Sequence, residues 1–184
     1  MIRRIGLILL ASGVLALAQA DKPGPEKLAP YYPTPLPVVE RMLKFAGLKP
    51  GEKMFDIGSG DGRIVIMAAA KFEADSTGVE IDSALAKQSN DKIRSLGLQK
   101  LARVIDGDAL QQDYSSADVI TVYLLPRSND KLRPILERQL RPGTRVVAHD
   151  FIFRDWTPER EEHVEDDGEG RSHTLYLYVI HSHK

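Results

Sequence analysis

The residues best suited to chemistry lie in one short stretch, residues 56–62, with the sequence DIGSGDG. Its alternating glycines follow a run with strand character, residues 54–57, and precede an apolar, alanine-rich run typical of a helix, residues 64–70. A tight strand-to-helix turn without side chains lets a ligand lie against the backbone and places its polar groups near the helix N-terminus. The stretch therefore predicts a nucleotide-type binding loop.

The spacing of the glycines indicates which ligand the loop takes. The dinucleotide-binding pattern is G-x-G-x-x-G, whereas the third glycine here comes one residue early. Asp56 lies just before the loop, would repel a pyrophosphate and favours a ligand with positive charge. S-adenosylmethionine fits, because its amino and sulfonium groups are cationic and it carries no phosphate. A glycine-rich turn in some other α/β protein stays open as an alternative, and so does a nicotinamide dehydrogenase, which would need a further substrate domain.

Two more acidic residues are predicted at the ends of neighbouring strands. Glu80 lies near the end of a strand predicted over residues 76–81, and it follows Gly60 at about the distance at which an acid can hydrogen-bond ribose hydroxyls. Asp108 follows a strand predicted over residues 102–106 and could accept a hydrogen bond from the adenine amino group. In an open parallel sheet the ligand lies outside the carboxyl ends of the strands, so we expect these acids and the glycine loop to meet at one site.

The order of the elements predicts the fold that positions these residues. Strand-like and helix-like runs alternate, which is typical of a parallel sheet with right-handed crossovers. We expect an α/β fold with a single doubly wound, mostly parallel sheet of about seven strands. The tail departs from the alternation, and residues 162–165 and 173–181 are predicted to finish the sheet as a C-terminal antiparallel hairpin. The other predicted strands are residues 117–123 and 144–149. The predicted helices are residues 36–45, 84–96 and 129–140. Ser83 is expected to cap the second of these helices, and Pro134 is expected to kink the third.

Composition limits the chain to one ordinary domain. Its 184 residues are enough for a real core but not for a second domain. The formal net charge is −1, so no basic excess points to nucleic acid, and we expect no nucleic-acid partner. Cysteine is absent, which removes disulfides and thiolate chemistry from consideration.

The N-terminal segment predicts a targeting signal. An apolar run, residues 5–18, follows two arginines, and the small residues at 18–20 (AQA) are typical of a signal-peptidase site. We therefore expect a signal peptide over residues 1–20 and an exported, periplasmic protein. The alternative is an uncleaved membrane anchor that leaves the domain in the cytoplasm. A linker over residues 21–30 and a single domain over residues 31–184 are predicted to follow.

A resemblance to a known family supports this interpretation. Residues 55–62, 78–82 and 107–109 resemble the first three motifs of class I S-adenosylmethionine-dependent methyltransferases. The resemblance extends from about Tyr31 to the C-terminus, so that residues 31–184 form the expected methyltransferase domain, and it implies S-adenosylmethionine as cofactor. The predicted cofactor-binding residues are Tyr32, Thr34, Asp56, Gly58, Ser59, Gly60, Gly62, Glu80, Ile81, Asp108 and Ala109.

A narrower similarity concerns the methyl acceptor. It is to the lysine methyltransferases that modify the c-subunit of mitochondrial ATP synthase and to their prokaryotic relatives, and the first part of the chain also resembles the histone lysine methyltransferases of the telomeric-silencing type. These resemblances imply a protein lysine as acceptor and place Thr34 near the methionine end of the cofactor. At the fourth motif the chain has YLL from Tyr123 onward, where the histone enzymes carry an asparagine. The similar stretches are residues 32–35, 56–65, 123–126, 131–133, 142–147 and 155–158.

Lysine methylation sets chemical requirements. Transfer from a sulfonium is an in-line displacement, so much of the acceleration can come from alignment of nucleophile, methyl group and sulfur. A lysine amine, with a reference pKa of about 10.4, must first lose its proton, and a dry channel with aromatic walls favours the neutral amine. His149 and Asp150, at the end of a predicted strand, could accept that proton, and Tyr123 is the third catalytic candidate. The candidates for the channel wall are Tyr32, Tyr123, Phe151 and Trp156.

Other interpretations stay open. A small-molecule N- or O-methyltransferase would have a closed pocket over the cofactor, whereas a protein substrate needs an open groove. An exported, non-catalytic module that binds an adenosyl ligand would explain a leader on a protein whose cofactor is made inside the cell. His173, His181 and His183 could place two metal ligands on one face of a strand, but a third is not evident, and we expect no metal.

Overall fold

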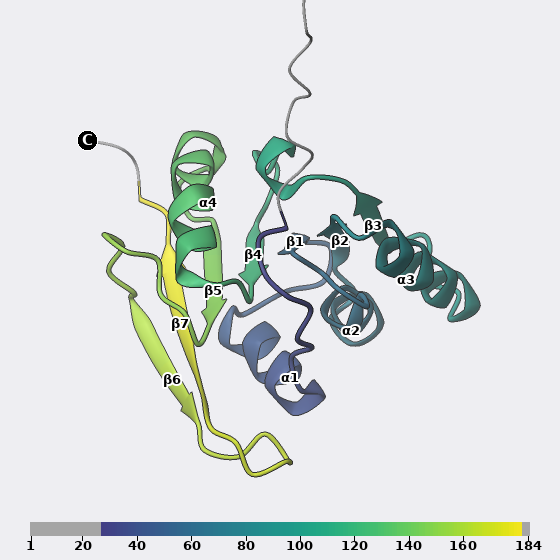
Figure 1. Cartoon of the computed structure of the whole chain (residues 1–184), viewed down its shortest axis with the longest axis horizontal. Coiled ribbons are helices and arrows are strands. Elements are labelled where there is room, and N and C mark those ends of the chain that lie inside the picture. The colour runs from purple at the N-terminus through teal and green to yellow at the C-terminus, as the bar shows by residue number, and fades with distance from the viewer. Residues whose placement is uncertain (1–26, 182–184) are drawn as a thin grey trace, which may run out of the picture.

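A seven-stranded sheet forms the centre of the protein in the computed structural model, which describes residues 27–181 (Figure 1). The strands are β1 (Lys53–Ile57), β2 (Asp75–Glu80), β3 (Ala102–Asp106), β4 (Val119–Val122), β5 (Arg145–His149), β6 (Arg160–Val164) and β7 (His173–Val179). The helices are α1 (Leu36–Phe45), α2 (Arg63–Phe72), α3 (Ser83–Ser95) and α4 (Pro126–Gln139), with a 3₁₀ turn η1 (Ala109–Gln111). The strand order is β3-β2-β1-β4-β5-β7-β6. The pairs β5–β7 and β7–β6 are antiparallel and the other pairs are parallel. The predicted mostly parallel sheet with an antiparallel C-terminal pair is confirmed.

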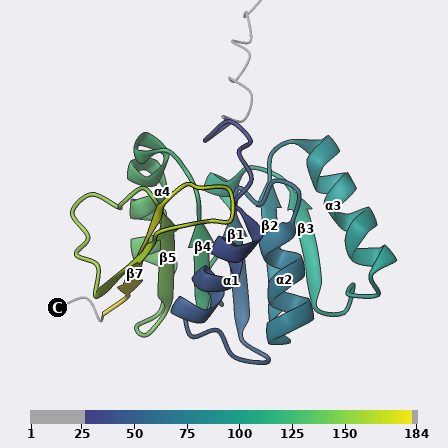
Figure 2. The same ribbon diagram turned by 90° about the horizontal axis from the view of Figure 1, so that it is seen from below.

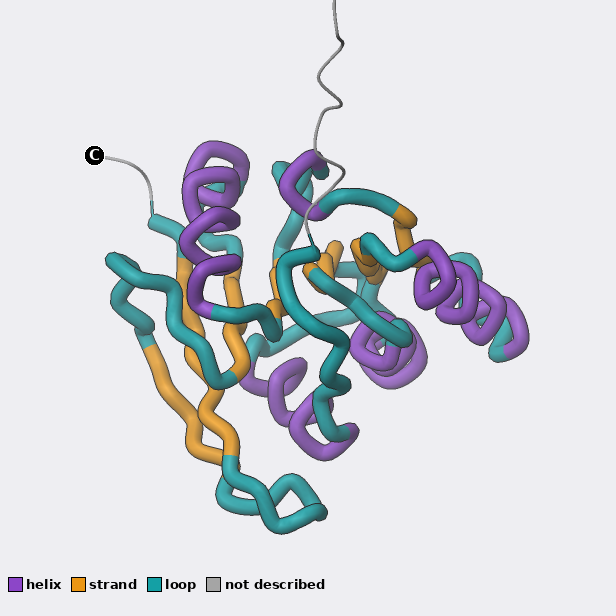
Figure 3. Tube along the Cα trace, in the orientation of Figure 1, coloured by secondary structure: helices purple, strands orange, loops and turns teal. Residues whose placement is uncertain are grey.

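Helices cover both faces of the sheet (Figure 3). Met54 of β1 and Val119 of β4 pack against α1 and α2, which lie in front of the central strands in Figure 2. Their neighbours Phe55 and Ile120 point to the opposite face and pack against α4. Because the central strands are buried on both faces, they consist mainly of apolar and β-branched residues rather than an alternating pattern.

The starts of α3 and α4 differ from the prediction. α4 begins at Pro126, three residues earlier than expected, because a proline fits the first turn of a helix, and Pro134 lies inside the same helix. α3 is capped by Asp82 and not by Ser83. The Asp82 carboxylate accepts hydrogen bonds from two backbone N–H groups of the first turn, at 3.0 and 3.2 Å, and Ser83 is the first helical residue.

The insertion of β7 between β5 and β6 brings two histidines together. β7 runs antiparallel to β5, and the register pairs His149, the last residue of β5, with Leu175. His173, the first residue of β7, therefore lies beside the carboxyl end of β5. This is the edge of the sheet that also carries the glycine loop.

The predicted leader, residues 1–20, lies outside the described residues, and so does most of the predicted linker. The last residues of that linker, 27–30, pack on the domain, where Leu28 and Ala29 contact the core on the α4 side of the sheet. Within residues 27–181, no helix has both the length and the apolar character that crossing a membrane would require.

Candidate functional site

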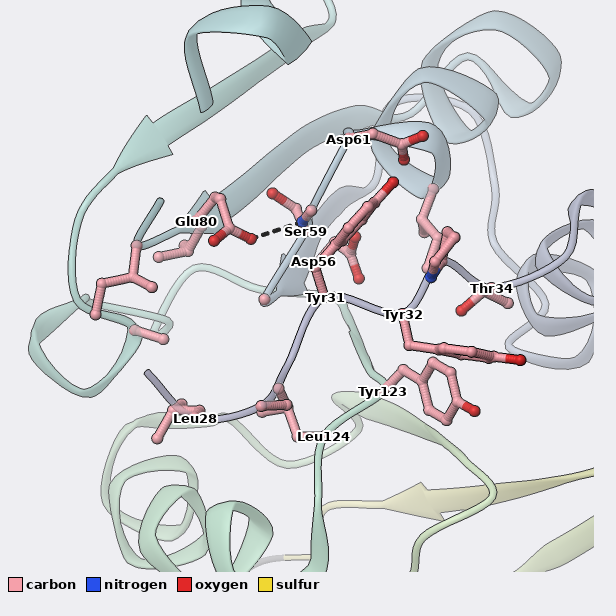
Figure 4. A pocket seen from close by; sticks show the side chains of 18 of the residues that line it. Leu28, Tyr31, Tyr32, Thr34, Asp56, Ser59, Asp61, Glu80, Tyr123 and Leu124 are labelled. Atoms are coloured by element: carbon pink, nitrogen blue, oxygen red, sulfur yellow. Dashed lines mark hydrogen bonds between the residues drawn. The ribbon is translucent and has the colours of Figure 1, made fainter. Parts of the chain in front are cut away.

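A cleft of about 770 Å³ opens at the carboxyl ends of β1, β2 and β4 (Figure 4). This is where an open α/β sheet takes its ligand. The volume includes the open solvent at the mouth of the cleft. The structure brings residues from well-separated parts of the chain together here. The predicted cofactor residues that line the cleft are Tyr32, Thr34, Asp56, Gly58, Ser59, Gly60, Glu80, Ile81 and Ala109.

The glycine loop forms one wall with bare backbone. Gly58 and Gly60 have φ of 77° and 54°, a left-handed conformation that glycine adopts without strain. A Cβ on Gly60 would lie 2.7 Å from the ring of Tyr31, and one on Gly58 would lie 2.9 Å from Leu124. Gly62 does not line the cleft, and it permits close packing of the start of α2 against Ser89 of α3.

Glu80 is held rigidly at the end of β2. Its Oε2 accepts a hydrogen bond from the backbone N–H of Gly60 at 2.7 Å (Figure 4). Its Oε1 accepts from the backbone N–H of Asp82 at 2.9 Å. The side chain is buried yet lines the cleft. A carboxylate fixed in this way can accept hydrogen bonds from two adjacent hydroxyl groups, as a ribose presents them.

Asp56 places a second carboxyl group in the cleft. Its Oδ1 accepts a hydrogen bond from the Thr121 hydroxyl at 2.8 Å. Burial raises the pKa of Asp56 to about 7, with smaller contributions in the same direction from the charges of Glu80 and Asp61. A buried carboxyl group that faces a cleft suits a cationic ligand, because the cation compensates the cost of burying the charge.

The residues before α1 form a strap over the cleft, residues 27–34. The sequence predicted Tyr32 and Thr34 at the cofactor, but not the contacts that hold the strap in place. Tyr31 lies against Gly60, the Arg63 guanidinium donates to the carbonyl of Thr34 at 3.0 Å, and the Ser128 hydroxyl donates to the carbonyl of Leu28. The proline-rich composition that predicts a linker carries no sign of these contacts, because their partners are far away in the sequence.

Two tyrosines form the wall near Thr34. The rings of Tyr32 and Tyr123 meet edge to face with centroids 6.4 Å apart (Figure 4), and Tyr32 is 54% exposed, so the cleft reaches the surface here. Burial, followed by the charge of Asp150, raises the pKa of Tyr123 to about 12. Tyr123 therefore keeps its hydroxyl proton at physiological pH.

Several predicted site residues lie elsewhere. Phe151 stacks on Tyr123 at 6.2 Å but does not line the cleft. Trp156 lies outside the predicted channel, because its indole N–H donates to Glu137 at 2.9 Å and its ring stacks on Phe153. The Asp108 carboxylate caps η1 and is not part of the lining.

Ser59 lines the cleft, but its hydroxyl points toward β2. A Cβ added to Gly78 would lie 2.5 Å from its Oγ. The hydroxyl oxygen is buried and has no hydrogen-bond partner among the described residues.

A cluster of titratable residues adjoins the cleft. His149 Nδ1 lies 3.3 Å from the hydroxyl of Thr34, and His149 Nε2 lies 2.9 Å from Nδ1 of His173. Nδ1 of His173 also lies 2.9 Å from Oδ2 of Asp150, and Nε2 of His173 lies 3.2 Å from Oδ2 of Asp167. Sequence patterns indicated His149 and Asp150, but gave no sign that His173 and Asp167 join them.

The cluster satisfies its own polar groups. The side-chain atoms of His149, Asp150 and His173 that could bind a metal lie within 4.8 Å of one another, a spacing that could hold a cation. These atoms already make hydrogen bonds to one another. Of the other histidines weighed as ligands, His181 pairs with Glu159 at 2.9 Å, and His183 lies outside the described residues.

The chain is similar to known methyltransferases. The family model described as the ANTKMT methyltransferase domain matches residues 56–160. A protein-lysine N-methyltransferase of Saccharolobus islandicus (strain REY15A) is 42% identical over 156 residues, which cover 84% of this chain and 96% of that protein. The human lysine N-methyltransferase of the ATP synthase c-subunit is 32% identical over 139 residues, 76% of this chain but only 58% of the human protein.

A solved structure is similar to this chain as well. The RNA methyltransferase from Salinibacter ruber, in complex with S-adenosyl-L-homocysteine, is 44% identical, with a TM-score of 0.76, and the match covers 83% of this chain and 96% of that one. The acidic groups and bare glycine backbone of the cleft fit such a ligand, which offers a cationic amino group and ribose hydroxyls.

Proposed function

The chain belongs to the family of the ANTKMT methyltransferase domain, and we propose that it methylates lysine side chains of a protein. It is a methyltransferase with a class I fold, and its cofactor is S-adenosylmethionine. The observation that carries the lysine proposal is the 42% identity to a protein-lysine N-methyltransferase over 96% of that protein's length.

Different residues of the cleft contact different parts of the cofactor in this proposal. We infer that Glu80 accepts hydrogen bonds from the ribose hydroxyls and that Asp56 faces the cationic amino group, whereas the glycine loop lets the ligand approach the backbone. When bound, the cofactor supplies an electrophilic methyl group on its sulfonium. Tyr32 and Tyr123 border the exposed end of the cleft, where an aromatic wall excludes water and favours a neutral lysine amine.

The surface beside this opening favours a basic polypeptide. Arg171 donates to the Tyr32 hydroxyl at 2.5 Å, so the loop between β6 and β7 lies next to the channel. That loop carries exposed carboxylates at Glu165, Asp166 and Glu169, of which Glu169 pairs with Arg171 at 2.6 Å. Carboxylates attract a lysine-bearing substrate and repel a phosphate backbone.

RNA is the second candidate acceptor. It is favoured by the 44% identity to the Salinibacter ruber protein, which is described as an RNA methyltransferase. The net charge of −1 and the acidic loop make it the weaker candidate. A small-molecule acceptor is the third candidate, and the half-exposed Tyr32 argues against the closed pocket that it would need.

The N-terminal leader bears on where the protein is located. The leader predicted over residues 1–20 implies export to the periplasm, or an anchor that would associate the protein with a membrane and leave the domain in the cytoplasm. N-terminal sequencing of the native protein distinguishes the two, because a chain that starts at Asp21 has lost the anchor.

The acceptor is tested by incubating the full chain with methyl-labelled S-adenosylmethionine and extracts of its host cell. We expect the label in protein, resistant to ribonuclease and recovered as methyllysine after hydrolysis. Label in RNA or in a small molecule would overturn the lysine proposal. A parallel reaction with Glu80→Ala, which should bind the cofactor poorly, identifies labelling by contaminating enzymes.

A further inference from the structure

The buried histidine at the start of β7, His173, makes hydrogen bonds that fix where its ring protons lie. Its Nδ1 lies 2.9 Å from Oδ2 of Asp150, and its Nε2 lies 3.2 Å from Oδ2 of Asp167. An ionised carboxylate accepts hydrogen bonds and donates none. Both ring nitrogens of His173 must therefore carry a proton, and the ring is an imidazolium between two carboxylates.

Both carboxylates are ionised. Burial raises the pKa of Asp150, but hydrogen bonds from His173 and from a backbone N–H outweigh it and lower the pKa of that carboxyl group. Burial likewise opposes the ionisation of Asp167, but hydrogen bonds from the backbone N–H of Glu169 and from the Arg171 guanidinium lower its pKa. Ionised carboxylates stabilise the charged form of an imidazole that lies between them.

The charge of His173 sets the tautomer of its neighbour, His149. Nε2 of His149 lies 2.9 Å from the protonated Nδ1 of His173, so it can only accept, and His173 shares this proton between His149 and Asp150. Burial, opposed by Asp150 and assisted by His173, lowers the pKa of His149 to about 4, so this ring is neutral near pH 7. A neutral imidazole has one ring proton, which must then lie on Nδ1 of His149.

The tautomer of His149 in turn directs the hydroxyl group of Thr34. Nδ1 of His149 lies 3.3 Å from the Thr34 hydroxyl oxygen and donates its proton to it. Within residues 27–181 the Thr34 hydroxyl makes no other hydrogen bond, so its own proton remains free to be donated. Thr34 is buried except where it lines the cleft, and a ligand in the cleft is therefore the available acceptor.

We propose that His173 and His149 together fix Thr34 as a hydrogen-bond donor to the cleft, where it binds the α-carboxylate of S-adenosylmethionine. This carboxylate is the only anionic group that the cofactor carries. Figure 4 shows Thr34 and Glu80 on opposite sides of the cleft. Such a separation suits a ligand whose ribose and carboxylate are joined by the methionine chain.

The charges of the cleft make a fixed donor necessary at this position. Three carboxyl groups line the cleft and repel an anion, those of Asp56, Asp61 and Glu80. The guanidinium of Arg63, which also pairs with Asp61, donates to the carbonyl of Thr34 at 3.0 Å and brings positive charge beside it. With the other tautomer of His149, the Thr34 hydroxyl would donate to the ring and present only lone pairs to the ligand. The tautomer thus decides whether Thr34 attracts or repels a carboxylate.

The neighbouring groups keep the two histidines in place. The ring of Tyr123 lies against His149 with centroids 3.8 Å apart, and its hydroxyl donates to Oδ2 of Asp150 at 3.3 Å. His149 is 0% exposed, so water does not compete for its ring nitrogens. Neither histidine touches the ligand, and both act through Thr34 as positioning residues.

The test compares two ligands by calorimetry on the full chain. They are S-adenosylhomocysteine and its decarboxylated analogue, which keeps the adenosine, the thioether and the amino group. Thr34→Val removes the donor and keeps the shape of the side chain. We expect it to raise the Kd for S-adenosylhomocysteine about 30-fold and to leave the Kd for the decarboxylated analogue unchanged. Thr34→Ser keeps a hydroxyl and should bind both ligands as the wild type does. Equal weakening of both ligands by Thr34→Val would overturn the carboxylate contact.

His173→Gln tests whether the imidazolium acts through Thr34. The amide is uncharged and no longer forces His149 to accept, so we expect the Kd for S-adenosylhomocysteine to rise about tenfold and that for the decarboxylated analogue to stay the same. Added to Thr34→Val, the change should have no further effect, because both substitutions remove one contact. Additive effects, or equal losses for the two ligands, would show a structural role and overturn the proposal. His163→Gln alters an exposed histidine of β6 and should bind as the wild type does.

Nitrogen-15 spectra of the histidine rings test the proton positions without any substitution. In the wild type near pH 7 we expect protons on both ring nitrogens of His173 and on Nδ1 alone of His149. In His173→Gln the proton of His149 should move toward Nε2. A neutral His173, or a wild-type His149 with its proton on Nε2, would overturn the proposal.

The proposal rests on S-adenosylmethionine as cofactor and not on the lysine acceptor, and the experiments separate the two. If the wild type binds S-adenosylhomocysteine but methylates no lysine, only the proposed acceptor fails. If Thr34→Val binds S-adenosylhomocysteine as tightly as the wild type, only the role of Thr34 and the histidines fails. A wild type that binds neither ligand would overturn the cofactor and this proposal together.

Discussion

The two ends of the cleft are built in different ways. At the cofactor end, backbone glycines and Glu80 form a rigid cradle from residues close in sequence, since Gly60 and Glu80 are 20 positions apart. At the other end, where we propose that the methyl acceptor enters, side chains of distant segments meet, since Thr34 and His149 are 115 positions apart. The glycine loop and Glu80 of the first end lie on neighbouring elements, β1 and β2, whereas the second end exists only when β7 has joined the sheet.

The largest effect should come from Glu80→Ala. It removes the acceptor for ribose hydroxyls and releases the Gly60 N–H, and charge-assisted hydrogen bonds contribute about 1.5–3 kcal/mol each. We expect at least about a 100-fold increase in the Kd for S-adenosylhomocysteine by calorimetry. Glu73→Ala, at an exposed site after α2, is the matched control and should bind normally. If Glu80→Ala bound S-adenosylhomocysteine as tightly as the wild type, Glu80 would not be a cofactor-binding residue.

Gly60→Ala tests the contact between the loop and the strap. The new Cβ would lie 2.7 Å from Tyr31 and require a left-handed conformation, so we expect a loss of about 2–3 kcal/mol in the free energy of unfolding and weaker cofactor binding. Gly97→Ala has a similar φ of 72° but open space around it, and it should cost only about 1 kcal/mol. Denaturant titrations measure the free energy of unfolding of both variants. Equal losses of stability would show that Tyr31 moves aside without an energetic cost.

The pH dependence of cofactor binding tests Asp56. Its pKa of about 7 in the free protein means that a cationic ligand must displace a proton at lower pH. We expect the affinity to fall by up to tenfold per unit as the pH drops below about 7, and Asp56→Asn to remove this dependence. The folded-state pKa is raised, so the stability of the free protein should also decrease as the pH rises from about 4 to 7. A cofactor affinity that does not change with pH would show that the cationic group of the ligand does not lie against Asp56.

The smallest effect should come from Trp156→Phe. The change removes the 2.9 Å hydrogen bond to Glu137 and keeps the stacking on Phe153, so we expect a loss of about 1 kcal/mol in stability. Cofactor affinity and kcat should not change. An altered KM for the protein substrate would return Trp156 to the acceptor channel, where its sequence context first placed it.

The difference between the two ends also explains what the sequence could predict. The glycine loop and Glu80 follow from local spacing, because a strand, a turn and the next strand end fix their geometry. The sheet follows from the alternation of elements. The contacts of His173 with His149, and of the strap with Gly60, depend on the antiparallel insertion of β7 and on the path of residues 27–34, and neither leaves a periodic pattern in the sequence.

The placement of β7 also determines when the site is complete during synthesis. A nascent chain that has emerged through β5 already holds the glycine loop, Glu80 and His149, but Asp167 and His173 follow only with the last hairpin. Long-range contacts are costly to close, and they form late in folding. We therefore expect a growing chain to assemble the glycine loop and Glu80 before its C-terminal hairpin docks and brings His173 beside His149.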